Sequence, residues 1–208
     1  KSKTTDYSKF WSDLLITKKF WWQDWEVFNR DYIAFRLSLY RYLGRTSISL
    51  NEFFYGAITS IPDDIEIKVP EVSSIKISTI NYRYPNTNAE QHFDVGDSVL
   101  NGSGAPFDSF IYVETVSNKR LLLAFQMKFT QNEGTIDENA VNNEFKKMEN
   151  SISNNLPGTD FICVILSRCE RKFEDQLPFK CVVVSLTENE MFYGQSYFQQ
   201  LNLLGHGK

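Results

Sequence analysis

Apolar residues recur every three or four positions near the start of the chain. They are Trp21, Trp25, Phe28, Tyr32, Phe35, Leu39 and Tyr42. This spacing places them on one face of an α-helix and predicts a long helix over residues 18–43. Gly44 follows the last of them and suits the positive φ of a helix end. A shorter helix is expected from Ser49 or Asn51 to about Ile58.

Between residues 65 and 84 the pattern changes to strict alternation. Apolar and polar residues alternate over Ile65–Val69 and again over Ile75–Ile80. This period of two is typical of strands with one solvated face. We expect an added hairpin or a sheet edge over about residues 64–84.

The segment from 92 to 186 predicts three strands, a helix and further strands. The three strands are expected at 92–100, 107–114 and 120–128. A capping-box spacing at Thr135–Glu138 starts the helix, which continues to about residue 156 through Val141, Phe145, Met148 and Ile152. The continuous apolar runs 161–166 and 180–186 are typical of strands that are covered on both faces.

These elements predict one α/β domain over residues 1–208. Its core at 92–186 follows the order three strands, helix, strand. With the long N-terminal helix before it, the order becomes helix, three strands, helix, strand. We expect a mixed central sheet flanked by helices, and a last helix over 188–204 from its amphipathic pattern.

Composition limits the classes of function. The 208 residues are 42% hydrophobic, enough for a buried core, and the net charge of −4 argues against a general polycation that coats nucleic acid. No apolar run approaches the ~20 residues of a membrane span. Three cysteines without a C-x-x-C spacing predict reduced thiols and an intracellular protein. The chain begins at Lys1 without a signal peptide, so we expect a portion of a longer protein.

The polar residues that carry candidate chemistry lie at strand ends. With a period of two, Gln126 and Lys128 leave the third strand on the same face. A hairpin turning at Ser117–Lys119 would bring Asp108, at the start of the second strand, beside them. Carboxylate and amide oxygens suit Mg²⁺, and a lysine can orient an attacking water. The cluster indicates phosphodiester hydrolysis.

The segments Pro106-Phe107-Asp108 and Gln126-Met127-Lys128 resemble the motif of the PD-(D/E)XK nuclease superfamily, the restriction-endonuclease-like fold. The glutamine form occurs in its Mrr-like branch. More narrowly, residues 105–110 and 125–128 look like the nuclease domains of Crinkler and RHS-type effectors, proteins delivered into a host cell or its nucleus. The superfamily resemblance covers about residues 20–186.

This resemblance implies roles for individual residues. Asp108 would bind Mg²⁺ (or Mn²⁺ as a substitute), with Gln126 and the main-chain carbonyl of Met127 completing the metal site. Lys128 would position the water and stabilise the reacting phosphate. The superfamily usually adds an acid from the first helix, and Glu26 is our choice.

Two alternatives for the acidic residues stay open. Asp24 is the second candidate on the first helix. Asp94 and Asp97, on or just after the first strand, would supply further charge if they face the same cleft. The basic pair Lys146-Lys147 is a candidate for a phosphate track.

The sequence departs from the family motif in two ways. Phe107 separates Pro106 from Asp108, and Gln126 supplies a neutral oxygen where many relatives have a carboxylate, which lowers the expected metal affinity. Ordinary structural interpretations also compete. The strand-end cluster would then be a solvated ion pair worth up to ~1 kcal/mol, and Glu26 would pair with Arg30 at i, i+4.

We therefore predict a metal-dependent endonuclease that acts on double-stranded DNA, as the catalytic part of a larger effector-type protein. A homodimer is expected from fold analogy, because cutting both strands needs two sites. The alternative is a weakened nuclease fold that serves as a nucleic-acid or protein interaction module. A third interpretation is a regulatory domain that binds neither metal nor nucleic acid. His92 and His206 receive no role, and the tryptophans at helical spacing are assigned to the core.

Overall fold

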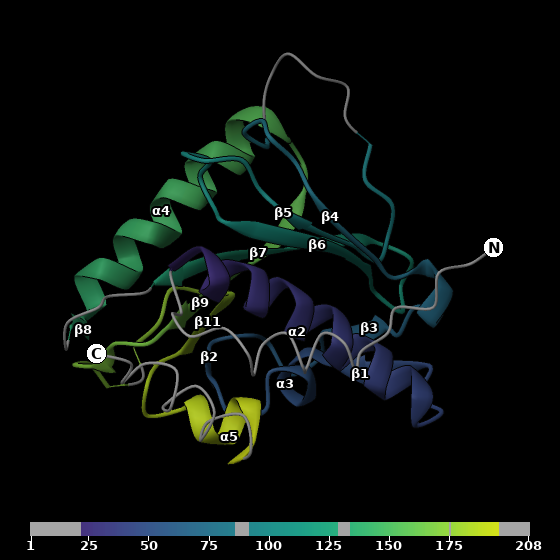
Figure 1. The fold of residues 1–208 in the computed structure, drawn as a ribbon, viewed down its shortest axis with the longest axis horizontal. Coiled ribbons are helices and arrows are strands. Elements are labelled where there is room, and N and C mark those ends of the chain that lie inside the picture. Colours follow the sequence, from purple (N-terminus) through teal and green to yellow (C-terminus); the bar gives the residue numbers. More distant parts are fainter. Residues whose placement is uncertain (1–21, 86–91, 129–133, 175, 196–208) are drawn as a thin grey trace.

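A mixed seven-stranded sheet lies at the centre of the molecule (Figure 1). The computed structural model describes residues 22–85, 92–128, 134–174 and 176–195. In spatial order the strands are β2 (Ile58–Thr59), β11 (Cys181–Val184), β9 (Asp160–Ser167), β7 (Arg120–Lys128), β6 (Ser109–Glu114), β5 (Asp97–Leu100) and β4 (Lys76–Thr79).

The strand directions are mixed, as predicted. β5, β6 and β7 form an antiparallel meander, in which Ser109 lies opposite Phe125. β9 runs parallel to both β7 and β11, and β4 runs parallel to β5. The helix α4 (Glu138–Asn155) makes the crossover from β7 to β9. A parallel pair needs such a long connection, which explains the helix after the third strand.

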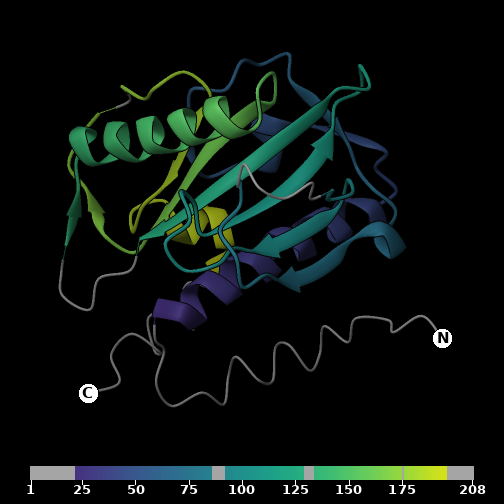
Figure 2. The same cartoon turned by 90° about the horizontal axis from the view of Figure 1, so that it is seen from above.

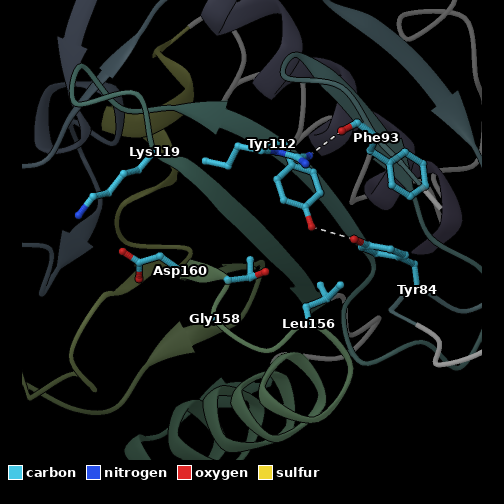
Figure 3. A pocket seen from close by; sticks show the side chains of 9 residues that line it. Tyr84, Phe93, Tyr112, Lys119, Leu156, Gly158 and Asp160 are labelled. Carbon is cyan, nitrogen blue, oxygen red and sulfur yellow. Dashed lines mark hydrogen bonds between the residues drawn. The ribbon is translucent and has the colours of Figure 1, made fainter. Parts of the chain in front are cut away.

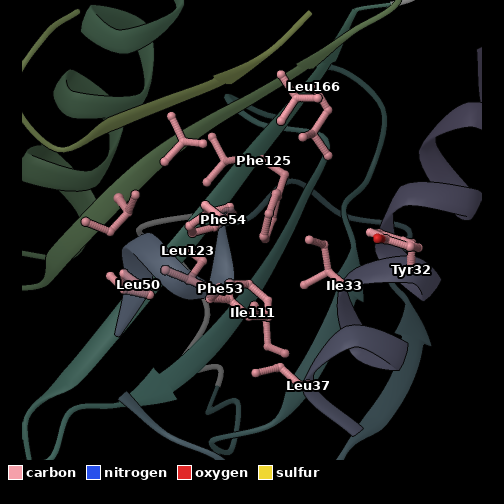
Figure 4. Close-up of a cluster of buried hydrophobic side chains, with 14 of the residues drawn as sticks. Tyr32, Ile33, Leu37, Leu50, Phe53, Phe54, Ile111, Leu123, Phe125 and Leu166 are labelled. Carbon is pink, nitrogen blue, oxygen red and sulfur yellow. The ribbon is translucent and has the colours of Figure 1, made fainter. Parts of the chain in front are cut away.

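Helices cover both faces of the sheet. α4 lies on one face, whereas α2 (Trp22–Tyr42), α3 (Leu50–Phe53) and α5 (Asn189–Tyr193) lie on the other (Figures 1 and 2). Side chains of β7 alternate between the two cores. Leu123 and Phe125 pack on the α2 side (Figure 4), and Leu122 and Ala124 pack on the α4 side. The predicted period-two alternation of this strand is confirmed.

The buried face of α2 differs from the predicted stripe. Trp25, Phe28 and Tyr32 are buried as expected, but Leu39 is 41% exposed and Tyr42 is 86% exposed. An average spacing of 3.5 residues drifts by about 20° per heptad around a straight helix of 3.6 residues per turn. The buried face therefore shifts to a neighbouring set of positions, which includes Ile33 and Leu37. Residues 18–21 of the predicted helix lie outside the described residues, and Gly44 has the expected positive φ of 78°.

The predicted second helix is shorter than expected. Ser49 does cap it, since its hydroxyl accepts a hydrogen bond from the Glu52 amide, but α3 ends at Phe53 and Ile58 belongs to β2. Gly56 explains why the helix does not continue to Ile58. Its φ is +93°, and a Cβ atom there would lie 2.6 Å from the backbone of Met191.

The predicted hairpin over residues 64–84 is wrong, whereas the sheet edge is confirmed. β3 (Glu66–Lys68) pairs with β1 (Ser47–Ser49) in a separate two-stranded sheet. A single-turn 3₁₀ helix, η1 (Val72–Ser74), then leads to β4, which forms the edge of the central sheet. Period-two alternation identifies a strand but does not identify its partner.

One helix boundary also needs correction, and another lies outside the described residues. The capping box at Thr135–Glu138 is wrong, because Thr135 and Ile136 form β8, which pairs with β10 (Glu170–Arg171). Asp137 caps α4 instead, accepting a 2.8 Å hydrogen bond from the Ala140 amide. Within the predicted last helix, α5 covers Asn189–Tyr193 and is followed by Gly194 with φ 85°. Gln195 is helical again, and residues 196–208 lie outside the described residues.

Candidate active site

The loop between β5 and β6 places Asp108 directly before the first residue of β6. The Asp108 amide donates to the Phe125 carbonyl (2.8 Å), and its own carbonyl accepts from the Asn101 amide (2.7 Å). Gly102 packs directly on Tyr82, since a Cβ atom there would lie 2.5 Å from the Tyr82 carbonyl oxygen. Backbone hydrogen bonds and the close packing of Gly102 thus fix the main chain around Asp108, independently of the contacts of its side chain.

Gly102→Ala should displace this loop. The added methyl group meets backbone rather than a movable side chain, so we expect a loss of about 1–3 kcal/mol in the free energy of unfolding. We also expect Asp108 to move, with at least a roughly tenfold loss of any activity that depends on it. Urea unfolding measures the first effect. Ser103→Ala, at the exposed neighbouring position, should change neither, and equal effects of the two substitutions would contradict this account.

The structure brings Asp108 and Gln126 together. One carboxylate oxygen of Asp108, Oδ2, accepts hydrogen bonds from Gln126 Nε2 (2.5 Å) and from the Met127 amide (2.6 Å). Lys128 follows on the same face of β7 as Gln126. The hairpin thus produces the predicted juxtaposition at the end of the strand.

α4 adds two charged residues to this cluster. Glu144 forms an ion pair with Lys128, and Lys147 Nζ lies 3.4 Å from both Gln126 Oε1 and Glu144 Oε2. The Gln126 carboxamide is therefore held between a carboxylate on its nitrogen side and an ammonium on its oxygen side. This arrangement fixes the orientation of a side chain that carries no charge.

Glu144 was not anticipated from the sequence, although a signal was present. It lies three residues after Val141 and four before Met148, so it shares their sheet-facing side of α4. Its side chain is only 16% exposed. Lys147 was considered for a phosphate track and does reach the site, whereas Lys146 is exposed on the helix.

Glu26 on α2 is coupled to Asp108. Burial, and secondarily the negative charge of Asp108, raise the pKa of Glu26 to about 7. The competing interpretation, an i, i+4 pair with Arg30, is not what the structure shows. Arg30 instead donates to Asp31 (2.6 Å) and to the Ser78 carbonyl on β4 (3.1 Å). This supports Glu26 over Asp24, which lies in the first turn of α2.

The charge state of Asp108 reflects opposing effects. Burial raises its pKa, while the hydrogen bond from the Met127 amide and the charges of Lys147 and Lys128 lower it in part. The net direction is upward. Glu26 and Asp108 both have raised pKa values and interact electrostatically, so a cation between them would be stabilised.

Asp94 and Asp97 do not face this site, so that expectation was wrong. Their carboxylates lie 3.4 and 3.8 Å from the Lys76 ammonium. The register that pairs Ser98 with Ile111 places Asp97 at the far end of β6, about 13 Å from Asp108 along the strand. The meander reverses direction between them, and the sequence alone did not show which strand ends meet.

The other described residues considered from the sequence are not part of this cluster. Trp25 is fully buried, which confirms its assignment to the core, and Cys163, Cys169 and Cys181 are free, buried thiols. His92 is exposed. Trp21 and His206 lie outside the described residues.

The donor set fits a hard divalent cation. Two carboxylates and the Met127 carbonyl are oxygen donors. The Gln126 amide oxygen is a further donor of this kind, but it faces Lys147 while the amide nitrogen faces Asp108. The Met127 carbonyl points to the same side of β7 as its amide, which faces Asp108. The described part of the chain holds no cluster of three or more His, Cys, Asp or Glu residues that could bind a metal. Mg²⁺ commonly uses only one or two carboxylates, with waters and substrate phosphate completing its shell.

Comparisons with protein-family models, with curated proteins and with solved structures found no match to this chain. Among the helices that the structure describes, none combines the length and apolar character needed to cross a membrane.

Proposed function

We propose that this chain is a metal-dependent endonuclease of the PD-(D/E)XK type that hydrolyses phosphodiester bonds of double-stranded DNA. The observation that carries the proposal is the convergence of Asp108, Gln126, Lys128 and Glu26 around the start of β6 and the end of β7. The element order supports it: α2, then β5, β6 and β7, then α4 and β9. These four residues come from three different elements, which an ordinary surface ion pair does not require.

Asp108 and Glu26 would hold Mg²⁺ or Mn²⁺, with the Met127 carbonyl as a neutral ligand. Gln126 would add its Oε1 once its carboxamide turns over, because in the structure its Nε2 faces Asp108 and its Oε1 faces Lys147. When bound, the metal supplies charge neutralisation at the phosphate and a more acidic water. Lys128 would orient the attacking water and stabilise the negative charge that develops on the phosphate oxygens. Glu144 holds the Lys128 ammonium in place, and Lys147 adds a second cation beside Gln126.

One observation favours a second candidate, an interaction module. The Lys128 ammonium is already paired with Glu144, and Gln126 contributes no negative charge to the metal site. A fold of this type with lost chemistry would bind nucleic acid or protein without binding Mg²⁺.

Incubation of the purified chain with supercoiled plasmid separates the two candidates. A nuclease nicks or linearises the plasmid with Mg²⁺ or Mn²⁺ and fails to do so with EDTA. Absence of cleavage, together with absence of Mn²⁺ binding by calorimetry, would favour the interaction module. Sedimentation of the same sample tests the homodimer that cleavage of both strands would require.

Metal affinity should depend on pH through Glu26. Because its pKa is about 7, a metal ion must displace a proton below that value, so we expect Mn²⁺ to bind roughly tenfold more weakly at about pH 6 than at about pH 8. In the metal-free protein the same raised pKa makes the contribution of Glu26 to stability largest below its ordinary pKa of 4.5, and this contribution is lost as the pH rises through about 7.

Calorimetric titration with Mn²⁺ across this pH range measures the dependence. Glu26→Gln should weaken binding and flatten the pH dependence, whereas the matched variant Asp24→Asn should leave it intact. If Mn²⁺ affinity became independent of pH in Asp24→Asn but stayed pH-dependent in Glu26→Gln, the metal-binding role would belong to Asp24 instead.

A further inference from the structure

A concave site lies far from Asp108, at the opposite end of β7. This cavity has a volume of about 440 Å³ and lies between the β6–β7 turn and the segment that joins α4 to β9 (Figure 3). It is lined by Tyr84, Phe93, Tyr112, Lys119, Arg120, Leu156, Gly158, Thr159 and Asp160. Arg120 and Lys128 are the first and last residues of β7, so the two sites are about 26 Å apart.

The inner wall of the cavity is aromatic. Tyr84 and Tyr112 join their hydroxyl groups in a 2.7 Å hydrogen bond, and Phe93 packs edge-on against the Tyr84 ring. The pair of hydroxyls has two hydrogens and uses one of them in this bond, so one donor remains. Burial, and secondarily the hydrogen bond with Tyr112, raise the pKa of Tyr84, which keeps its phenol protonated.

Arg120 extends this wall toward solvent. Its guanidinium lies 4.1 Å from the centroid of the Tyr112 ring and donates to the Phe93 carbonyl (2.6 Å). A guanidinium that lies over an aromatic ring can take a second planar group on its other face. The side chain of Arg120 is exposed, so that outer face is accessible to a ligand.

The charge at the mouth of the cavity is positive. Lys119 and Arg120 are adjacent and exposed. Asp160 supplies one negative charge, but Lys180 neutralises it through a 2.5 Å ion pair. The mouth of the cavity would therefore favour a ligand that stacks a planar group on Arg120 and places a negatively charged group beside Lys119.

We propose that this cavity binds a nucleotide unit, with its base stacked on Arg120 and its phosphate held by Lys119 and Arg120. The volume lies within the range of pockets that enclose small organic ligands. Base stacking, one hydroxyl donor and two adjacent cations match the three parts of a nucleotide. The unit comes either from a free mononucleotide or from a single strand. The inference does not depend on hydrolysis at Asp108.

The test uses calorimetry with the full chain carrying Asp108→Asn, so that no probe is cleaved. The probes are dAMP, deoxyadenosine, inorganic phosphate and a short single-stranded oligonucleotide. Because both parts of the nucleotide contribute, dAMP should bind more tightly than either deoxyadenosine or phosphate. Lys119→Gln and Arg120→Gln should each weaken dAMP binding roughly tenfold, since each removes a charge-assisted contact. Lys172→Gln makes the same charge change at another exposed position and should have no effect.

Binding of dAMP with this variant pattern supports a site for free nucleotides. The same pattern with the oligonucleotide alone supports a site for a strand. Phosphate that binds as tightly as dAMP would overturn the proposal, because stacking would then contribute nothing. The proposal would also be overturned if neither dAMP nor the oligonucleotide bound, or if both ligands bound to the Lys119→Gln and Arg120→Gln variants without any loss of affinity. Plasmid cleavage is scored separately, so a failure here leaves the endonuclease proposal as it stands.

Discussion

Asp108→Asn and Lys128→Ala should each reduce metal-dependent plasmid cleavage by at least about a thousandfold. Asp108→Asn removes the carboxylate that would hold the metal, while keeping a side chain of the same size that still accepts from the Met127 amide. Lys128→Ala removes the ammonium that we propose orients the attacking water. The rate of supercoiled-plasmid loss under excess enzyme measures both effects.

Matched controls exist for both substitutions. Asp94→Asn makes the same chemical change at the far end of the sheet, and Lys172→Ala removes an exposed lysine away from the site. Both should retain cleavage within about twofold, since neither side chain contacts the cluster at Asp108. Circular dichroism establishes that the variants are folded. Full activity in a folded Lys128→Ala protein would refute its assigned role.

Phe28→Ala should cause the largest loss of stability. Phe28 is fully buried where α2 meets α5, with ring centroids 5.8 Å from Trp25, 5.9 Å from Tyr32 and 5.6 Å from Tyr193. Truncation removes its contacts and leaves a cavity, so we expect a loss of about 3–5 kcal/mol in the free energy of unfolding. Guanidinium titration with fluorescence detection measures this loss.

The neighbouring residue provides the control. Val27 is 36% exposed on the same turn of α2, so Val27→Ala should change stability by no more than about 0.5 kcal/mol. A similar loss in both variants would mean that the helix itself, rather than the aromatic contacts, limits stability.

The sequence predicted the parts of the fold that depend on local periodicity. The bounds of β7 match the structure at both ends, and the alternation along it correctly separated the two cores. That alternation also placed Gln126 and Lys128 on one face. A hairpin turn at Asn118, which has φ 61°, was enough to bring Asp108 to them.

What the sequence did not predict depends on contacts between distant segments. The pairing of β3 with β1, and the position of Asp97 away from Asp108, follow from the packing of the whole sheet rather than from either segment. The ion pair of Glu144 with Lys128 depends on how α4 lies across β7 and β9. Asp137 replaced Thr135 as the cap because β10 takes Thr135 and Ile136 into a short ladder.

The position of β7 in the sheet has a consequence for the dynamics of the site. β7 is the central strand, with three strands on either side. Its amides should therefore exchange with solvent only on global unfolding, whereas a helix on the outer layer can open at lower free energy. Gln126 and Lys128 would stay in place through such local openings, while Glu26 would leave with α2. Hydrogen exchange should accordingly show the two halves of the proposed metal site in different cooperative units, with α2 as the half that opens first.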